Sequence, residues 1–416
     1  MSLSARLRVA VRRCSSLDSA SQTAKQITRY ASTFNARDND NYIQKSVFIS
    51  QSTNVFVNLA LEHWLYRNFD FSKHHVLLFW RNDPCVVFGR HQNPWLECNV
   101  QTSEKAGIAL ARRNSGGGTV YHDNGNLNLT FFTPRERYNR RYNLNIITNA
   151  LFRQWGLKSE INKREDIVVN EDCKISGTAA KLGKPNAYHH CTLLVNVNKA
   201  NLSSILERKE NGIVTNATTS IRSPIMNLID INQNIQMDKL LSAIGWEYLR
   251  TKALTLEDGR YDLVEQQKGF KFINPTEDWF PGIYEKQLLF FEKYVERIDN
   301  FTSEFRSWDW NFGRTPKFMV TRTLDFPAHD GKIYRLNLSL EVQNGFVEEI
   351  RMSLPADLVS TDFAQDASVI SNIRGTKYNH DVTENIIAAI GGKTATVNTT
   401  QSVDENNMRL DEVTLQ

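Results

Sequence analysis

The stretch RRNSGGGTVYHDNGN, residues 112–126, places three consecutive glycines between a pair of arginines and a β-prone run. Glycine permits positive φ and carries no Cβ, so backbone N–H groups around it can converge on a ligand. Arg113 could add a bidentate, charge-assisted contact to a phosphate or carboxylate, and Ser115 could add a hydroxyl. Neither the GxxxxGK(S/T) nor the GxGxxG pattern is present. The stretch is interpreted either as an anion site or as a flexible surface loop.

Polar residues continue beyond the glycines, where His122, Asp123 and Asn126 surround a DNGN turn. We expect the runs 119–122 and 127–133 to form two strands joined by this turn. An arginine, a glycine loop and these polar groups on one hairpin favour a binding site over a bare loop.

The composition indicates a soluble globular protein of two or three domains. The chain has 416 residues, of which 41% are hydrophobic and 23% charged, and no apolar run is long enough to span a bilayer. The formal charge is +4, but the first 29 residues carry six basic side chains against one acidic one, Asp18. The remainder is therefore close to neutral, which argues against a general nucleic-acid-binding protein.

The basic N-terminal segment has the composition of a mitochondrial transit peptide. It is rich in Ser and Ala, poor in acids, and spaces Leu3, Leu7 and Val11 at helical intervals. The alternative is a disordered basic tail. The five cysteines form no CxxC pair, which suits a reducing matrix, and the nine histidines show no HxxxH or HExxH pattern. We therefore expect no metal site.

Apolar runs and turn signals predict an α+β fold. Mostly antiparallel strand pairs with interspersed helices, including amphipathic helices around 56–65 and 144–155, form the first domain. A hairpin at Asn344–Gly345 marks a smaller second unit, entered through a helix at about 285–297. The expected organisation is a transit peptide at 1–30, a linker at 31–45, a catalytic domain at 46–284, an α+β accessory domain at 285–392 and a flexible tail at 393–416.

The motif CKISGTA, residues 173–179, carries a second candidate group. Strand alternation places Lys174 and Ser176 on one face and Cys173 on the other. A lysine on a half-buried face can stabilise a developing oxyanion, although spacing alone favours an ordinary edge-strand lysine. Cys173 could be a thioester nucleophile, but it has no local activating partner, so a buried structural cysteine is the better interpretation. His189 and His190 remain open between structural and catalytic roles.

Taken together, these motifs resemble the family of lipoate–protein ligases and lipoyltransferases, relatives of the biotin protein ligases. GRHQN, the glycine stretch, the Arg164–Asp166 segment, KISGTA and YHHCTLLVN occur in the order that the family shows, and SWDWNFGRTPKF resembles the start of its accessory domain. The resemblance covers about 46–350. It implies a class II aminoacyl-tRNA synthetase/biotin protein ligase-like catalytic domain with a small α+β accessory C-terminal domain.

The resemblance also implies a role for each motif. Lys174 would contact the acyl carbonyl and the phosphate of an acyl-adenylate while the lysine of an acceptor attacks. Apolar strands would enclose the dithiolane tail. The substrate-binding residues implied are Arg113, Ser115, Gly116, Gly117, Gly118, His122, Asn126, Asp166, Ser176 and Gly177.

The implied activity is transfer of a lipoyl group from lipoyl-AMP to a lysine ε-amine in the mitochondrial matrix. The acceptors would be the lipoyl domains of 2-oxoacid dehydrogenase acyltransferase subunits and the glycine-cleavage H protein. The enzyme is expected to be a monomer with no tightly bound cofactor. It is expected to bind neither nucleic acid nor a membrane. The alternatives are a complete ligase using lipoate, ATP and Mg²⁺, an amidotransferase between carrier proteins, and a non-catalytic scaffold that binds lipoyl domains.

One departure concerns the nucleotide. Where bacterial ligases have Arg-Asn-Asp, this chain has Arg164, Glu165 and Asp166. A carboxylate facing the nucleotide would repel a triphosphate, so the sequence favours transfer over ATP-dependent activation. Glu165 pointing to solvent or helping to bind magnesium is the alternative.

Overall fold

The computed structural model describes residues 43–170, 172–207, 212–276, 297–327, 332–353, 372–389 and 393–394. The predicted transit peptide, most of the linker, nearly all of the helix predicted at 285–297 and most of the tail lie outside these ranges. None of the described helices is long and apolar enough to cross a membrane.

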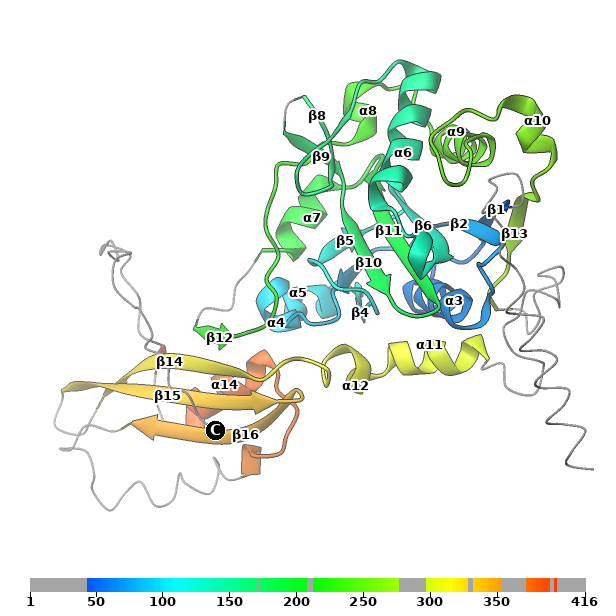
Figure 1. Ribbon diagram of the computed structural model, residues 1–416. Helices are drawn as coiled ribbons and strands as arrows, with labels where there is room; N and C mark the ends of the chain where they lie inside the picture. Colours follow the sequence, from blue (N-terminus) through cyan, green and yellow to red (C-terminus); the bar gives the residue numbers. More distant parts are fainter. Residues whose placement is uncertain are drawn as a thin grey trace, which may run out of the picture.

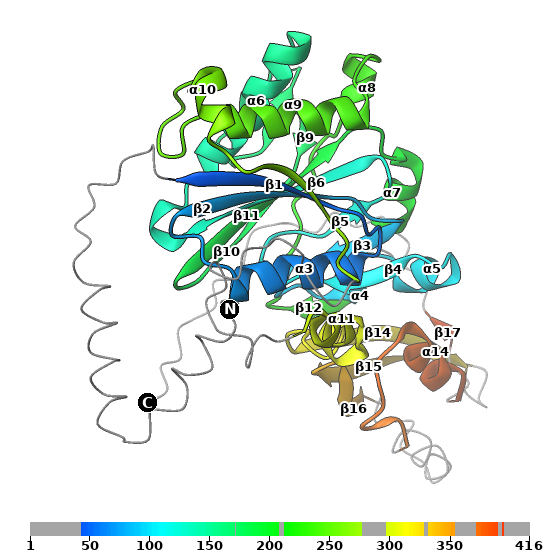
Figure 2. The ribbon, with the colours of Figure 1, turned by 90° about the vertical axis from the view of Figure 1, so that its right-hand side faces the viewer.

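A six-stranded mixed sheet forms the centre of the larger part of the molecule. Its strand order is β10-β11-β6-β2-β1-β13. Figures 1 and 2 show α6 and α9 over one face and α3 with α11 over the other. The strands are β1 (Gln44–Ser50), β2 (His74–Trp80), β6 (Asn126–Pro134), β10 (Thr178–Leu182), β11 (Asn186–Leu194) and β13 (Gly269–Ile273). The helices that cover it are α3 (Val55–Asn68), α6 (Arg140–Trp155), α9 (Met237–Arg250) and α11 (Ile298–Arg306).

Each face of this sheet carries its own apolar core, because alternate side chains of a strand point to opposite sides. Val47, Leu77 and Phe131 pack beneath α6 and α9. Phe48 and Leu78 pack toward α3 and α11. Both cores are lined with fully buried aliphatic and aromatic side chains, so the sheet is a rigid platform for residues at its edges.

Most strand pairs are antiparallel, as predicted, but β1 pairs in parallel with β2 and β13. Two small sheets extend the platform, with orders β4-β3-β5 and β7-β8-β9. Their strands are β3 (Cys85–Phe88), β4 (Ala109–Arg112), β5 (Val120–His122), β7 (Glu160–Ile161), β8 (Ile167–Val169) and β9 (Cys173–Ser176). The short helices of this part are α4 (Pro94–Glu97), α5 (Val100–Lys105), η3 (Arg135–Arg137), α7 (Lys199–Ile205), α8 (Leu228–Ile231) and α10 (Arg260–Glu265).

The hairpin predicted around the DNGN turn is wrong. β5 pairs with β3 in a small sheet, whereas β6 pairs with β2 and β11 in the main sheet. The turn at Gly125 carries the chain between them, and a Cβ there would lie 1.9 Å from the carbonyl oxygen of Asn196. The backbone of 195–196 donates to the Gly125 carbonyl, so this close approach replaces hairpin pairing.

The C-terminal unit is a sheet of order β12-β14-β15-β16, with β17 paired to β14 and α14 beside it (Figure 1). The predicted Asn344–Gly345 turn is confirmed, with φ of 52° and 77° at its two residues. The edge strand β12 comes from within the range predicted as the catalytic domain. The elements are β12 (Ile213–Thr215), β14 (Phe318–Pro327), β15 (Ile333–Gln343), β16 (Phe346–Ser353), α14 (His380–Ala389) and β17 (Lys393–Thr394).

Arg112 joins the two units at the base of the glycine loop. Its guanidinium donates to the carbonyls of Gly89, Gln92 and Asn311, and its backbone N–H donates to the Asn311 side chain at 2.7 Å. Asn311 ends α12 (Trp308–Asn311), the short helix that follows α11. Burial lowers the pKa of Arg112 to about 9. Because buried donors are costly to leave unpaired, these contacts fix the loop against the C-terminal part of the chain.

Candidate donor-binding site

Two adjoining chambers lie between the glycine loop, strands β9–β11 and the segment 218–223. We call the first, of about 310 Å³, the histidine chamber, because His122 and His190 line it. We call the second, of about 390 Å³, the leucine chamber; its wall includes Leu194, Leu202 and Leu206. The walls that both chambers share are formed by Thr119, Val120, Lys174, Gly177, Thr192, Ser220 and Ile221.

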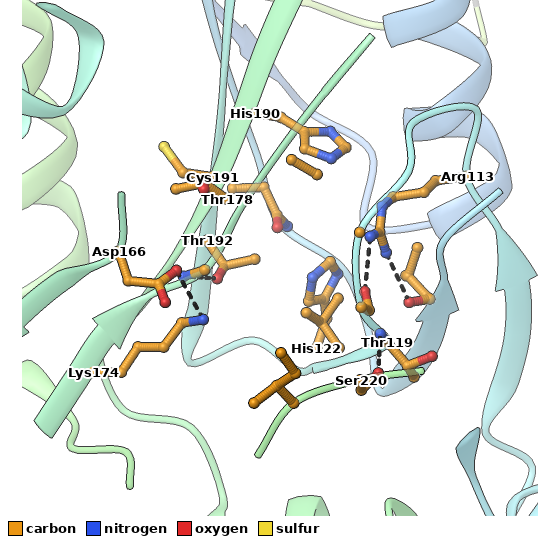
Figure 3. Close-up of a pocket in the computed structure, with 18 of the residues that line it drawn as sticks. Arg113, Thr119, His122, Asp166, Lys174, Thr178, His190, Cys191, Thr192 and Ser220 are labelled. Carbon is orange, nitrogen blue, oxygen red and sulfur yellow. Dashed lines mark hydrogen bonds and ion pairs between the residues drawn. The ribbon is translucent and has the colours of Figure 1, made fainter. Parts of the chain in front are cut away.

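Lys174 therefore stands at the junction of the two chambers. Its Nζ lies 2.9 Å from Oδ1 of Asp166, which is itself buried (Figure 3). Its backbone is held on both sides, since Lys174 N donates to Pro224 O and Met226 N donates to Lys174 O. A cation fixed in this way needs little reorganisation to stabilise negative charge that develops beside it.

A β-bulge explains which neighbours reach the cavity. Across β8, Val168 pairs with Lys174 but Ile167 pairs with Ser176, so Ile175 is an extra residue in β9. Ile175 packs into the main core, and Ser176 is fully buried away from both chambers. The predicted shared face of Lys174 and Ser176 is therefore wrong at the cavity, because a bulge breaks strict alternation.

Arg113 holds the glycine loop in shape. Its Nη2 donates to the carbonyls of Gly116 and Gly118 at 2.6 and 2.7 Å, its Nη1 donates to Val87 O at 3.1 Å, and its Nε donates to Ser115 Oγ at 3.0 Å. The buried guanidinium thus uses four of its five N–H donors within the protein. In this structure Arg113 shapes the wall of the histidine chamber; its direct contact with an anion stays a prediction.

The three glycines of the loop differ in backbone conformation and in the space available for a Cβ atom. Gly117 has a φ of +86°, and a Cβ there would lie 3.0 Å from Arg113 Nη2. A Cβ on Gly118 would lie 3.0 Å from Ser220 Oγ, whereas Gly116 faces open space. Neighbouring protein atoms and backbone conformation, rather than a ligand alone, account for two of the three positions.

Ser220 fastens the segment 218–221 over the glycine loop. Its hydroxyl accepts from Thr119 N at 2.8 Å (Figure 3). It also accepts from Gln92 Nε2 at 3.0 Å and donates to the Glu97 carboxylate. Thr119 in turn donates to Gln92 Oε1. This cluster joins three chain segments that are far apart in sequence into one cavity wall.

His122 is neutral and has a donor to spare. Burial lowers its pKa to about 3. Asn82 Nδ2 lies 3.1 Å from Nδ1 of His122. Because an amide nitrogen can only donate, Nδ1 is the acceptor and Nε2 of the neutral ring carries the proton. That Nε2 has no partner among the described residues, and neither has Nδ2 of Asn128 on the same chamber wall. Buried N–H donors of this kind await an acceptor from a ligand or water.

Comparisons with known proteins match this chain to lipoyl-transferring enzymes. Residues 54–247 match the lipoyl protein ligase A/B catalytic domain. The chain is 38% identical to the mouse protein named lipoyl amidotransferase LIPT1, mitochondrial, over 79% of this chain and 81% of the relative. The human protein of the same name is 36% identical, over 78% and 84%. The crystal structure of P. falciparum LipL1 with lipoate has a TM-score of 0.52 and 25% identity, over 84% of this chain and 96% of that chain.

The chain belongs to the lipoyl protein ligase family. It is a lipoyl-transferring enzyme that acts on proteins. The predicted α+β fold, with a lipoate-ligase catalytic domain and a smaller α+β C-terminal unit, is confirmed.

The structure brings most of the predicted site residues of this lipoyl protein ligase family member to the cavity. The histidine chamber is lined by Arg113, Gly117, Gly118, His122, Asp166, Lys174 and Gly177. Asn126 lines the leucine chamber. Ser115, Gly116 and Ser176 line neither chamber, and Ser115 instead bonds His190 at 2.9 Å. No group of His, Cys, Asp and Glu suited to a metal occurs in the part of the chain that the structure describes. The role of each residue stays a prediction.

Several wall residues were not predicted. Trp80, Arg140, Thr178, Thr192 and the segment 218–221 line the histidine chamber. Thr192 Oγ1 accepts from Gly177 N at 3.1 Å. A polar side chain on a strand opposite the KISG turn is a signal that could have identified Thr192 as a wall residue. The segment 218–221 carries no comparable signal, because its place over the glycine loop depends on tertiary contacts with Glu97 and Gln92.

The sequence left open whether Glu165 faces a bound nucleotide, points to solvent or helps to bind magnesium. Its carboxylate lies 2.9 Å from Nη1 of Arg140, a residue of the histidine-chamber wall. Its φ of 60° turns the chain so that adjacent carboxylates reach different cations: Glu165 reaches Arg140 and Asp166 reaches Lys174. Neither Cys173 nor its neighbour Asp172 lines a chamber, and Cys173 is half-buried against the main core.

We predict that Gly117→Ala and Gly116→Ala differ sharply. A Cβ at Gly117 meets Arg113 and forces an L side chain into left-handed backbone, which costs roughly 1–2 kcal/mol of stability. The same change at Gly116 meets open space and should be nearly silent. Urea unfolding and the KM for the lipoyl donor measure both effects. Equal behaviour of the two variants would show that the loop conformation does not matter.

The buried histidines predict a loss of stability in mild acid. Burial lowers the pKa of His75 and of His122 to about 3, whereas both titrate near 6.5 when unfolded. The unfolded chain therefore binds protons first as pH falls below 6.5, and each histidine should lower stability with a slope that approaches about 1.4 kcal/mol per pH unit near pH 5. Urea unfolding between pH 6.5 and 5 measures this slope.

His75→Phe provides the control for that slope, because His75 lines neither chamber and phenylalanine keeps the buried volume apolar. The variant should lose one histidine's share, which approaches about 1.4 kcal/mol per pH unit near pH 5. Parallel curves for the two proteins would contradict the assignment of a neutral, buried His75.

Proposed function

We propose that this protein transfers a lipoyl group from lipoyl-AMP to the ε-amine of a specific lysine in lipoyl domains and in the glycine-cleavage H protein. The observation that carries the proposal is the place of Lys174 where two chambers meet. An acyl-adenylate has two unlike ends joined by a mixed anhydride. With one end in each chamber, its reacting carbonyl and phosphate would lie beside the lysine.

The walls support this orientation of the donor. The histidine chamber offers Trp80, Val87, Ala179 and the uncharged His122 to an acyl chain. The leucine chamber adds two cations, Lys199 and Arg222, and serine side chains, together with apolar surface for a planar base. A ligand with an apolar tail and an anionic centre is complementary to this arrangement.

The proposed chemistry needs few groups. The neutral acceptor amine attacks the acyl carbonyl, the new C–N bond forms, the bond to the phosphate oxygen breaks, and AMP leaves as the amine loses a proton. Negative charge builds on the carbonyl oxygen and on the leaving phosphate. The Lys174 ammonium, released from Asp166, stabilises that charge together with loop N–H groups. The Asp166 carboxylate orients the lysine before the donor binds.

A second candidate is transfer from a lipoylated carrier protein, in which the donor is an amide. The mouse and human relatives are named lipoyl amidotransferase, and this name favours that donor. An amide donor carries no nucleotide and would leave the leucine chamber empty, whereas lipoyl-AMP would fill it, so this chamber favours lipoyl-AMP. We further propose location in the mitochondrial matrix, supported by the N-terminal composition and by the word mitochondrial in both names.

The experiment that tests the proposal compares three donors on one apo acceptor domain. The donors are lipoyl-AMP, lipoate with ATP and Mg²⁺, and a lipoylated H protein, and intact mass of the acceptor reports transfer. We expect rapid transfer from lipoyl-AMP and little from lipoate with ATP. Comparable rates with ATP would make this a complete ligase; faster transfer from the H protein would make it an amidotransferase. Acceptor binding without transfer from any donor would leave a scaffold.

We predict that Lys174→Ala lowers kcat/KM for transfer from lipoyl-AMP by ~10²–10³ while the protein remains folded, as when an oxyanion donor is removed. Cys173→Ser is the matched control, because it changes the adjacent residue outside both chambers. It should leave kcat/KM nearly unchanged. A Cys173→Ser variant as inactive as Lys174→Ala would replace the adenylate mechanism by a thioester.

A further inference from the structure

Glu62, on α3, is a buried carboxylate beneath the histidine chamber. Its side chain is 2% exposed and lines neither chamber. Two separate hydrogen-bond chains nevertheless end on its Oε1 atom, one from the glycine loop and one from Trp80 in the wall of the histidine chamber. A buried carboxylate is tolerated only where hydrogen bonds pair it, and these two chains provide that pairing for Glu62.

The first chain runs from the glycine loop. Arg113 Nε donates to Ser115 Oγ at 3.0 Å, Ser115 Oγ lies 2.9 Å from His190 Nε2, and His190 Nδ1 lies 2.9 Å from Glu62 Oε1. A guanidinium can only donate and a carboxylate can only accept. The His190 Nδ1–H therefore donates to Glu62, and with a neutral imidazole the Ser115 hydroxyl donates to Nε2.

The second chain runs from the chamber wall. Trp80 Nε1 donates to Thr130 Oγ1 at 3.0 Å, and the Thr130 hydroxyl donates to Glu62 Oε1 at 2.8 Å. Trp80 lines the histidine chamber, as do Arg113 and His190 at the end and middle of the first chain. Three wall residues from β2, β11 and the glycine loop are thus oriented by one acceptor on α3.

The charges of Arg113 and Glu62 also connect the glycine loop with α3. Burial lowers the pKa of Arg113 to about 10, and Tyr188, followed by Glu62, opposes that shift. The hydrogen-bond partners of the Arg113 guanidinium are carbonyl oxygens and one hydroxyl. Glu62 therefore helps to compensate a buried cation that it does not touch.

We infer that Glu62 is a positioning residue for donor binding, which sets the orientation of Trp80, His190 and, through Ser115, the Arg113-held glycine loop. This inference rests on the proposed function, since it assigns the acyl group to the histidine chamber. Removal of the charge leaves both donors on a neutral amide oxygen, which accepts more weakly than a carboxylate. The effect should fall on donor affinity rather than on the chemical step at Lys174, which lies on the other side of the chamber (Figure 3).

The test uses the whole protein with Glu62→Gln and, as matched control, Glu247→Gln. Glu247 is also a buried carboxylate, 4% exposed, and accepts from Arg153 Nε at 3.0 Å, but it lies on α9 and lines neither chamber. Glu62→Gln should raise the KM for lipoyl-AMP and its calorimetric Kd roughly tenfold, as loss of hydrogen bonds to a charged group implies, with kcat within about threefold. Glu247→Gln should change only thermal stability.

A double-mutant cycle with Ser115→Ala tests whether the first chain acts as a unit. Glu62 and Ser115 share no hydrogen bond and are linked through His190, so coupled effects on Kd would have to pass along the chain. Non-additive losses support the inference. Additive losses, or a Glu62→Gln variant whose Kd equals that of the wild type, overturn it. If Glu62→Gln does not fold, Thr130→Val removes one donor of the second chain and carries the same KM-against-kcat test.

Failure of this inference is distinguishable from failure of the proposed function. A wild-type protein that binds lipoyl-AMP but transfers nothing would refute the function, while the calorimetric comparison of variants would still decide the role of Glu62. Wild-type transfer with equal donor affinity in all variants would refute the positioning role alone.

Discussion

The cavity of this protein depends on a loop that is held by its own arginine. Arg113 donates to the carbonyls of Gly116 and Gly118 and to Ser115, so the backbone that forms the chamber wall wraps around a buried guanidinium. A side chain on Gly117 would collide with that guanidinium, which explains why the loop needs glycine there. The arginine and the glycines are therefore one structural unit, and a buried cation of this kind requires the compensating polar network that ends on Glu62.

Local patterns predicted the elements well, because hydrophobic periodicity and turn residues act over short distances. The Asn344–Gly345 turn could be predicted from its own residues. The pairing of β5 with β3, rather than with β6, could not, because pairing is decided by where the chain crosses between sheets. The bulge at Ile175 was equally hidden: one extra residue in β9 changes which side chains reach the cavity.

The candidate site was predictable where chemistry and sequence proximity coincide. Lys174, His122, Gly117 and Gly118 were identified from motifs and line one cavity. Residues whose role is to hold others were missed, since a buried glutamate on an amphipathic helix looks like any other helical glutamate. Glu62 is recognisable only when Thr130 and His190, more than sixty residues away in sequence, are seen to donate to it. Positioning depends on tertiary contacts, and no single-sequence pattern encodes those directly.

Charge balance connects the turn at 164–166 with the choice of donor. Its two carboxylates pair separately with two cations of the chamber wall, Glu165 with Arg140 and Asp166 with Lys174, at 2.9 Å each. A donor phosphate must compete with Asp166 for Lys174, and Glu165 keeps Arg140 partly neutralised. An acyl-adenylate carries one ionised phosphate oxygen and can exchange places with a single carboxylate. A triphosphate carries several charges, and the two cations beside this turn, Arg140 and Lys174, are already paired with carboxylates. The proposed preference for transfer over activation is then explained by ion pairs within the wall rather than by direct repulsion from a free glutamate.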